Sequence, residues 1–144
     1  MNTASMVKDA RILIVDDEPS VVLLLERLLQ HDGYTNVVST TDPLLAQPLF
    51  ASFGPDLLLL DVNMPGLDGF GVMSQLGRCT VRGVHAPTMI ITADVTPEVR
   101  RRALIAGVDD FLTKPVVMTE LLMRVRCLLE ARFSQLAQRE LVAV

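Results

Sequence analysis

Short apolar runs alternate with longer amphipathic segments along most of this chain. Runs of four to six mostly aliphatic residues, bounded by turn-forming residues, have the length of buried strands. We expect strands near Arg11–Val15, Thr35–Ser39, Asp56–Leu60, Thr88–Thr92 and Asp110–Thr113. Apolar residues at helical spacing fall between them. This alternation predicts an α/β domain, with a parallel sheet covered by helices on both faces.

Five helices are expected, at about Pro19–His31, Pro43–Phe53, Gly69–Gly77 and Pro97–Gly107, and from about Val117 onward. Thr96 is a suitable N-cap for the fourth helix, because its hydroxyl can accept a bond from the first turn. Pro48 should kink the second helix, since proline removes a helical hydrogen bond. Residues 78–86 are predicted to form a loop.

The composition fits one domain without a membrane segment. The chain has 144 residues, half of them apolar, which is close to the usual domain size. A net charge of −4 argues against direct nucleic acid binding, which requires a basic surface. Cys79 and Cys127 are too few for a disulfide framework or a zinc site, which favours a reducing, cytoplasmic location. No stretch approaches the roughly 20 apolar residues that span a bilayer.

Charged residues follow three of the expected strands. Asp16 and Asp17 follow the first strand, Asp61 the third and Lys114 the fifth. Ligands of parallel sheets bind outside the carboxyl ends of the strands, so these groups should share one edge. Ordinary alternatives exist: the acidic pair could cap the following helix, and Lys114 could be a solvated residue. Asp61 is harder to dismiss, because the residues after it already supply the turn chemistry.

Clustered carboxylates need a cation. At an effective dielectric constant of about 20, each close pair of carboxylates repels by several kcal/mol. Oxygen ligands suit Mg²⁺ in particular. A hard cation, a lysine and a carboxylate nucleophile at one site together indicate phosphoryl transfer.

Residues 11–133 resemble the receiver domains of two-component response regulators. The motifs match in order and spacing: Asp16-Asp17, Asp61 with Met64-Pro65-Gly66 and Asp68-Gly69, Thr92-Ala93, and Lys114-Pro115. The resemblance implies a flavodoxin-like fold, in which a doubly wound five-stranded parallel sheet in the order 2-1-3-4-5 carries five helices. It also implies a signalling domain rather than an enzyme, one that catalyses only its own phosphoryl transfer and slow self-dephosphorylation.

The resemblance also implies roles for individual residues. Asp61 would accept a phosphoryl group from a histidine kinase or a histidine phosphotransfer protein. Mg²⁺ would be bound by Asp17, by Asp16 through water, by Asp61 and by the main-chain carbonyl of Asn63. The donors to the phosphoryl group would be the Lys114 ammonium, the Thr92 hydroxyl and the Ala93 N–H.

A conformational switch and a tuned lifetime are implied in the same way. Thr92 would move toward the phosphoryl group and Phe111 would turn inward, although Phe111 could also be an ordinary core residue. The changed surface, formed by the fourth helix, fifth strand and fifth helix, would control an output domain or a downstream protein. Asn63 and Asp94 occupy positions that influence phosphoryl lifetime, and their small polar side chains, which can admit or orient an attacking water, argue against an unusually long-lived phosphoryl state.

The chain ends suggest three segments: a flexible tail over residues 1–10, the receiver over 11–133 and an extension of the fifth helix over 134–144. An apolar stripe continues along that helix, through Leu122, Val125, Leu129, Phe133 and Leu136. Such a stripe is typical either of a normal covering helix or, beyond Arg132, of a dimerisation or linker helix. The chain could be a stand-alone receiver or a fragment of a larger regulator.

Three other functions are weighed against this one. A phosphatase of the haloacid dehalogenase type requires a second aspartate two residues after the nucleophile, where this chain has Asn63. An FMN-binding module requires a phosphate loop, where Asp16 and Asp17 would repel the phosphate. A pseudo-receiver that serves only as an interaction module is disfavoured, because the residues for phosphorylation are all in place.

Overall fold

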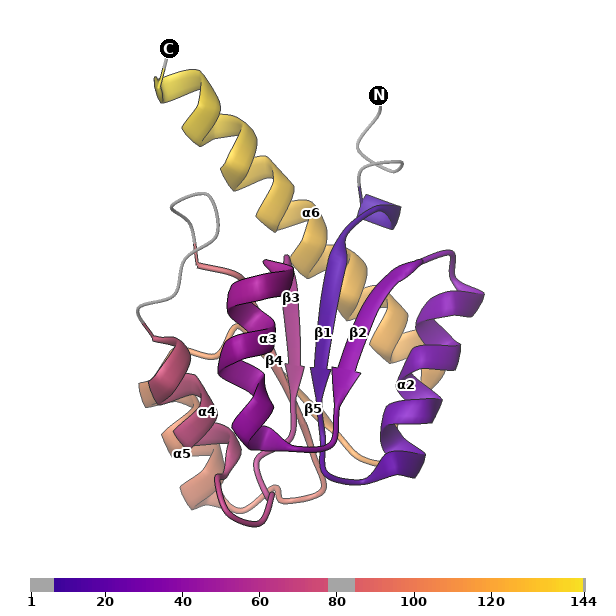
Figure 1. The fold of residues 1–144 in the computed structure, drawn as a ribbon, viewed down its shortest axis with the longest axis vertical. Coiled ribbons are helices and arrows are strands. Elements are labelled where there is room, and N and C mark those ends of the chain that lie inside the picture. Colours follow the sequence, from indigo (N-terminus) through magenta and orange to yellow (C-terminus); the bar gives the residue numbers. More distant parts are fainter. Residues whose placement is uncertain (1–6, 78–84, 144) are drawn as a thin grey trace.

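The computed structural model describes residues 7–77 and 85–143, with side chains described as far as residue 140. Five strands form one parallel sheet in the order β2-β1-β3-β4-β5, as expected (Figure 1). The strands are β1 (Arg11–Val15), β2 (Asn36–Thr40), β3 (Leu57–Leu60), β4 (Thr88–Thr92) and β5 (Asp110–Thr113). Their carboxyl ends therefore lie at one edge of the sheet.

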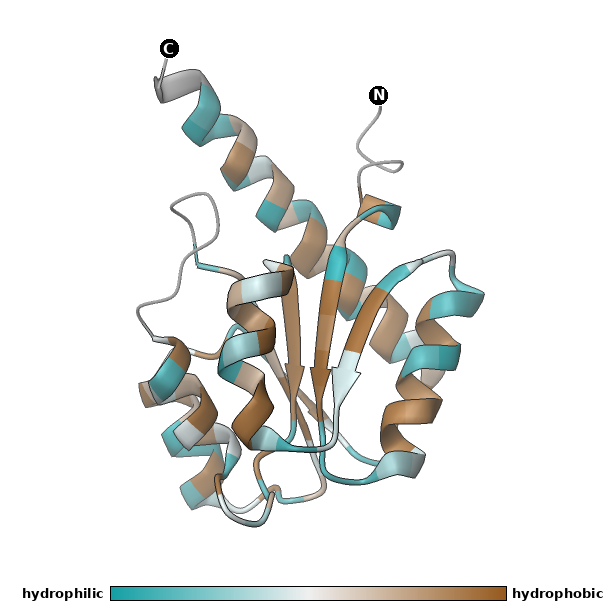
Figure 2. Cartoon of the chain, in the orientation of Figure 1, coloured by the Kyte–Doolittle hydropathy of each residue, from teal (hydrophilic) through white to brown (hydrophobic). Residues whose placement is uncertain are grey.

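Helices cover both faces of the sheet. They are α2 (Pro19–His31), α3 (Ala46–Phe53), α4 (Gly69–Leu76), α5 (Pro97–Ala106) and α6 (Met118–Ala143), with a short 3₁₀ turn at Pro43–Leu45. One apolar core joins α2 and α6 to the sheet, and a second joins α3, α4 and α5 to the opposite face. Alternate residues of each strand enter the two cores, which explains why the central strands are mostly apolar (Figure 2).

The predicted helix boundaries hold best where proline and glycine set them. Helix α5 begins at Pro97 behind the Thr96 cap and ends at Gly107, whose φ of 79° is left-handed. The helix expected over Pro43–Phe53 is divided into the 3₁₀ turn Pro43–Leu45 and α3, and the kink at Pro48 stays a prediction. Pro48 lies in the first turn of α3, where the N–H that proline lacks has no helical acceptor anyway. Of the predicted loop, residues 78–84 lie outside the described part, and residues 85–87 form neither helix nor strand.

Residues 7–10 are not a loose tail. Val7 and Ala10 are each 1% exposed and belong to the core beneath α2 and α6. The Lys8 ammonium lies 2.9 Å from the Asp32 carboxylate and 4.3 Å from the centre of the Tyr34 ring. The expectation of a flexible tail over residues 1–10 therefore fails for this part, because these contacts fix the approach to β1.

Helix α6 continues well past the sheet's end as one helix (Figure 1). Its apolar stripe is buried against the same chain as far as Leu136, which is 4% exposed. Arg132 is buried as well; its Nε lies 3.5 Å from Asp56, and it donates to the His85 carbonyl over 3.4 Å. These contacts within one copy account for the stripe without a partner helix. Within the described residues, no helix is long and apolar enough to cross a membrane.

Candidate functional site

The ends of β1, β3 and β5 bring three of the expected residues into direct contact. The Lys114 Nζ atom lies 3.0 Å from Asp16 Oδ2 and 3.2 Å from Asp61 Oδ2. Asp16 and Asp61 are only 2% and 4% exposed, although both follow directly after strands. The lysine is thus held between two buried carboxylates.

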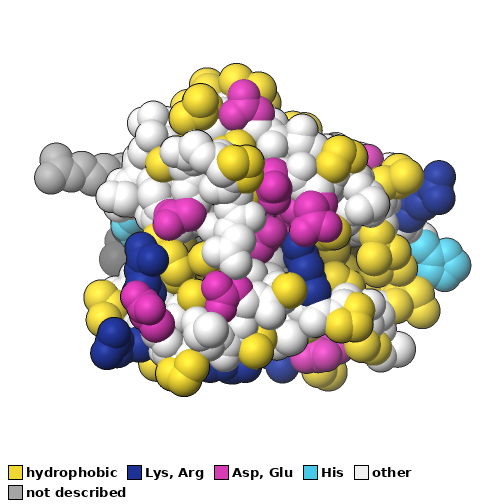
Figure 3. Space-filling model, turned by 90° about the horizontal axis from the view of Figure 1, so that it is seen from below, with side chains coloured by type: hydrophobic (Ala, Val, Ile, Leu, Met, Phe, Trp, Pro, Cys, Tyr) yellow, Lys and Arg dark blue, Asp and Glu magenta, His cyan; other side chains and the backbone are white. Residues whose placement is uncertain are grey.

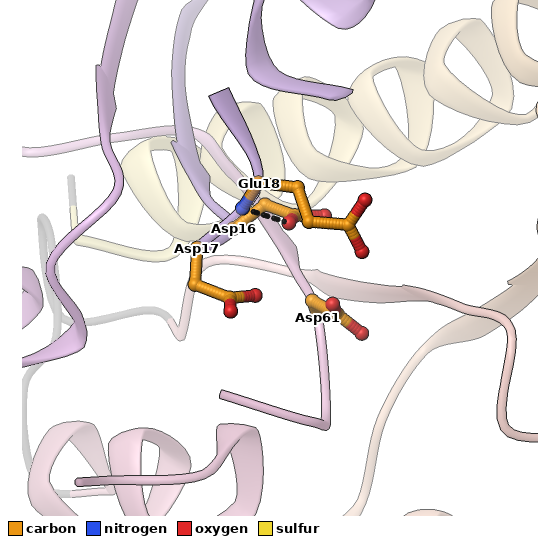
Figure 4. Close-up of side chains that lie close together, drawn as sticks. All are labelled: Asp16, Asp17, Glu18 and Asp61. Atoms are coloured by element: carbon orange, nitrogen blue, oxygen red, sulfur yellow. Dashed lines mark hydrogen bonds between the residues drawn. The ribbon is translucent and has the colours of Figure 1, made fainter. Parts of the chain in front are cut away.

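The carboxylates form a compact group. Asp16, Asp17, Glu18 and Asp61 each offer one oxygen, and these oxygens lie within 4.8 Å of one another (Figure 4). Acidic side chains gather near the centre of this face, with a basic side chain beside them (Figure 3). Because Lys114 supplies a single positive charge, the group remains strongly negative.

Burial shapes the electrostatics of the group. Burial raises the pKa of Asp16, although a hydrogen bond from the Glu18 N–H and the nearby Lys114 oppose this effect. Burial alone would lower the pKa of Lys114, but the Asp16 and Asp61 carboxylates outweigh it and raise the pKa. The carboxylates therefore favour the charged form of Lys114, whereas burial disfavours the charged form of Asp16.

Asp17 supplies an observation that fits a cation site. Its Oδ1 atom is buried and has no hydrogen-bond partner in the described part of the chain. A buried carboxylate oxygen without a donor is costly, and such an oxygen is a suitable ligand for a hard divalent cation. The donor set, which consists of oxygens alone, fits Mg²⁺.

The remaining expected residues lie on the loops beside this group. Thr92 is buried at the end of β4, and its Oγ1 accepts a bond from the Asp94 N–H over 3.2 Å. Since the oxygen accepts this bond, the hydroxyl hydrogen can still be donated to another group. Ala93 follows it and is exposed. The exposed Asn63 donates its Nδ2 to Asp94 over 3.1 Å, and this bond is the main cause of the lowered pKa of Asp94.

Phe111 lies apart from the carboxylates, half-buried on the side of the sheet that carries α5. The Arg100 guanidinium lies 5.0 Å from the centre of its ring. The Lys114–Pro115 peptide bond is cis.

The structure gives a place at the site to two residues for which the sequence analysis stated no role. Glu18 belongs to the carboxylate group and lies 3.7 Å from Lys114. Its position directly after Asp17 in the sequence could have indicated this. Gly69 is the second: a Cβ there would lie 2.3 Å from the carbonyl oxygen of Asp61, and its N–H donates to Val62 over 2.8 Å. The start of α4 can therefore approach the Asp61 loop only because residue 69 has no side chain.

A cavity of about 350 Å³ lies at the other end of the sheet. It is lined by residues near the starts of β3 and β4, including Leu58 and Thr88, and by parts of α3, α4 and α5. None of its lining residues belongs to the carboxylate group. We assign function to the carboxylate group because clustered carboxylates, a partly buried lysine and an unpartnered carboxylate oxygen occur together there.

Comparison with known proteins agrees with this geometry. The sequence model of the response regulator receiver domain matches residues 12–126. Response regulator MprA of Mycobacterium ulcerans is 45% identical over 119 residues, which cover 83% of this chain and 50% of that protein. MprA of Mycobacterium tuberculosis strain H37Rv is 44% identical with the same coverage. The chain thus spans about half the length of these curated relatives.

Solved structures of receiver proteins superpose closely. Chemotaxis protein CheY4 of Vibrio cholerae gives a TM-score of 0.75 at 26% identity, over 83% of this chain and 98% of that chain. The Francisella response regulator 1452 receiver domain gives 0.75 at 26% identity, over 85% and 98%. The receiver domain from Methanospirillum hungatei, at 0.79 and 23% identity over 88% and 98%, supports the fold alone. The chain is therefore a signalling domain rather than a classical enzyme, and it belongs to the response regulator receiver domain family of two-component systems.

Proposed function

We propose that Asp61 accepts a phosphoryl group from the phosphohistidine of a histidine kinase or a histidine phosphotransfer protein. A carboxylate oxygen of Asp61 attacks the phosphorus, the new O–P bond forms as the P–N bond breaks, and the imidazole leaves with the electron pair. The observation that carries the proposal is the position of Lys114, within 3.2 Å of Asp61 and 3.0 Å of Asp16.

The acidic group is the proposed magnesium site of this reaction. Asp16, Asp17 and Asp61, with the main-chain carbonyl of Asn63, would hold the ion, and the unpartnered oxygen of Asp17 supports this assignment. Bound Mg²⁺ would offset the negative charge of the carboxylates and of the incoming phosphoryl group.

The neighbouring residues bind and orient the phosphoryl group. Lys114 would exchange part of its contact with Asp61 for a phosphoryl oxygen, because it already lies beside the attacking carboxylate. The Thr92 hydroxyl and the Ala93 N–H would supply two further donors. Asn63 and Asp94 flank the site and would influence how quickly water removes the phosphoryl group.

Phosphorylation would then change the surface formed by α5, β5 and α6. A shift of Thr92 toward the phosphoryl group opens space near α5, and Phe111 would move into it. Phe111 is already half-buried against that core, so the movement required is short. The readers of this surface would be an output domain, such as the half of the relatives that this chain does not span, or a separate downstream protein in the cytoplasm.

Intact-protein mass after incubation with Mg²⁺ and acetyl phosphate tests the proposal. We expect one added phosphoryl group on the wild-type chain, lost on chelation of Mg²⁺ and absent from Asp61→Asn. Asp9→Asn is the matched control, because Asp9 is an exposed aspartate that precedes β1 at the other end of the sheet. Phosphorylation of Asp61→Asn to the wild-type level would contradict the assignment.

Binding of beryllofluoride, a phosphoryl mimic, separates donor choice from an inactive site. Wild-type protein that binds it with Mg²⁺ has a competent acceptor, even if acetyl phosphate is a poor donor. Failure to bind either compound would favour a pseudo-receiver that acts only as an interaction module.

A further inference from the structure

A chain of hydrogen bonds joins the loop that follows Asp61 to the first turn of α5. This loop, residues 62–68, is called the acceptor loop below. Asn63 Nδ2 donates to Asp94 Oδ2 over 3.1 Å. The hydroxyl of Thr96 donates to the other oxygen, Asp94 Oδ1, over 2.9 Å, and the Thr96 N–H reaches the same oxygen over 3.2 Å. Asp94 therefore bridges two loops, with one carboxylate oxygen bonded to each side.

Thr96 has a second bond that extends the chain into the helix. Its Oγ1 accepts from the Val99 N–H over 3.4 Å, which makes Thr96 the N-cap of α5. One hydroxyl thus donates to Asp94 and accepts from the helix. A displacement of Asp94 must either move Thr96 with it or break the two bonds between them.

Asp94 is also bonded to Thr92. Its N–H donates to Thr92 Oγ1 over 3.2 Å, so three segments meet at this one residue: the acceptor loop, the end of β4 and the start of α5.

We infer that Asp94 and Thr96 are positioning residues that couple occupancy of the Asp61 site to the position of α5, alongside the proposed movement of Phe111. The inference rests on the proposed function. A group bound at Asp61 acts on Asn63 through the acceptor loop and on Thr92 directly. Movement of Asn63 or of Thr92 displaces Asp94, because both residues are bonded to it. The bond from the Thr96 hydroxyl to Asp94 then moves the N-terminus of α5.

Three substitutions at position 96 separate this coupling from simple helix capping. Thr96→Ser keeps both the cap and the hydroxyl donor. Thr96→Asp keeps the cap, since aspartate caps well, but it has no hydrogen to donate to Asp94 at neutral pH. Thr96→Val keeps the shape and loses both functions. Thr96 is exposed, so none of these changes disturbs the core.

The measurement is amide hydrogen exchange of α5 with Mg²⁺, before and after addition of beryllofluoride, with calorimetry confirming that each variant binds it. We expect beryllofluoride to change α5 exchange in the wild type and in Thr96→Ser. The change should be about fivefold smaller in both Thr96→Asp and Thr96→Val, the lower end of ordinary coupling between sites.

Each other outcome overturns the inference. If Thr96→Asp responds like the wild type and only Thr96→Val does not, the residue acts as a cap alone. Equal responses in all four proteins would show that the coupling runs elsewhere. Wild-type protein that binds beryllofluoride without any change in α5 keeps the proposed acceptor site and rejects the coupling. Wild-type protein that does not bind at all removes the proposed function, and this inference with it.

Discussion

Tyr34 is an unusual residue at the end of the molecule away from the acidic group. Its side chain is fully buried, yet its hydroxyl has no hydrogen-bond partner among the described residues. Burial raises its pKa to about 12. The ring packs in the core with Val7 and lies beneath the Lys8 ammonium. The ring therefore contributes packing, while the hydroxyl contributes an unsatisfied polar group.

Replacing Tyr34 with phenylalanine should keep the packing and remove the unsatisfied hydroxyl. We expect the free energy of unfolding to stay the same or to rise by about 1 kcal/mol, measured by urea denaturation. A loss of stability of that size would mean that the hydroxyl is bonded after all.

The same residue predicts an alkaline pH dependence. Because the pKa is raised from 10.0 to about 12, the unfolded state ionises first, so the Tyr34 contribution to stability is lost as pH rises through this window. Tyr34→Phe should lack this part of the decline. Tyr34 is the only tyrosine of the sequence, so its ionisation can be followed directly by ultraviolet absorbance.

Gly69 offers a test of the acceptor loop. In Gly69→Ala, the new Cβ would lie 2.3 Å from the Asp61 carbonyl oxygen, and the backbone would have to shift. We expect a loss of about 1–3 kcal/mol in stability, as for overpacked sites, together with weaker beryllofluoride binding. Gly77→Ala is the matched control at the other end of α4, because a Cβ there meets nothing closer than 3.5 Å. Equal effects of the two changes would contradict the steric argument.

At the level of elements, tertiary contacts determine what covers the apolar stripe of α6. The stripe through Leu136 would suit a dimer, but in the structure it is covered by the same chain. The partners of Arg132 show why this could not be foreseen: Asp56 and His85 lie 76 and 47 residues away in the sequence. Helical spacing identifies an apolar face, but it does not identify what covers that face.

Leu136→Ala should therefore destabilise the protein rather than alter its association. We expect a loss of about 2–5 kcal/mol in the free energy of unfolding, the usual range for a buried leucine. Gln138→Ala, an exposed change on the same helix, should have little effect. Light scattering on both variants checks the alternative: a dimer that dissociates on Leu136→Ala, without loss of monomer stability, would restore the dimerisation hypothesis.

The other elements were predictable to different degrees, for physical reasons. The central strands β1, β3 and β4 were found because burial on both faces makes them mostly apolar, and α5 because Thr96, Pro97 and Gly107 each have a conformational preference at its ends. Asp16, Asp61 and Lys114 were placed at one edge because parallel strands end together. The bonds of Asp94 to Asn63 and Thr96 were not predicted, since they depend on how two loops lie side by side.

For the molecule as a whole, the buried carboxylates make the stability of the fold depend on pH and, under the proposed function, on Mg²⁺. The raised pKa of Asp16 means that the folded state holds a proton that the unfolded state releases above about 3.8. Without metal, the contribution of Asp16 to stability therefore falls as pH rises through that window. Asp16→Asn should remove this part of the pH dependence, which thermal unfolding in a chelating buffer would measure.

Bound Mg²⁺ should reverse this pH dependence, so that the folded state becomes more stable as pH rises. At a concentration about 100 times its dissociation constant, Mg²⁺ would stabilise the folded state by about 2.7 kcal/mol. We expect this gain at neutral pH and its loss as pH falls toward the raised pKa of Asp16, because protons and the cation compete for the same oxygens. An equal gain in Asp61→Asn/Asp17→Asn would show that the ion binds elsewhere.

Helix α6 is fixed to the rest of the molecule at several points between Leu121 and Leu136, with the Arg132–Asp56 ion pair near the far end. The helix and the sheet must therefore tumble in solution as one body. A fluorescent label placed on α6 just after Leu136 would report, through its anisotropy, the rotation of the entire domain. Any increase in the size of the assembly, such as the docking of a kinase, would then be visible at a position far from the acidic group and without disturbing it.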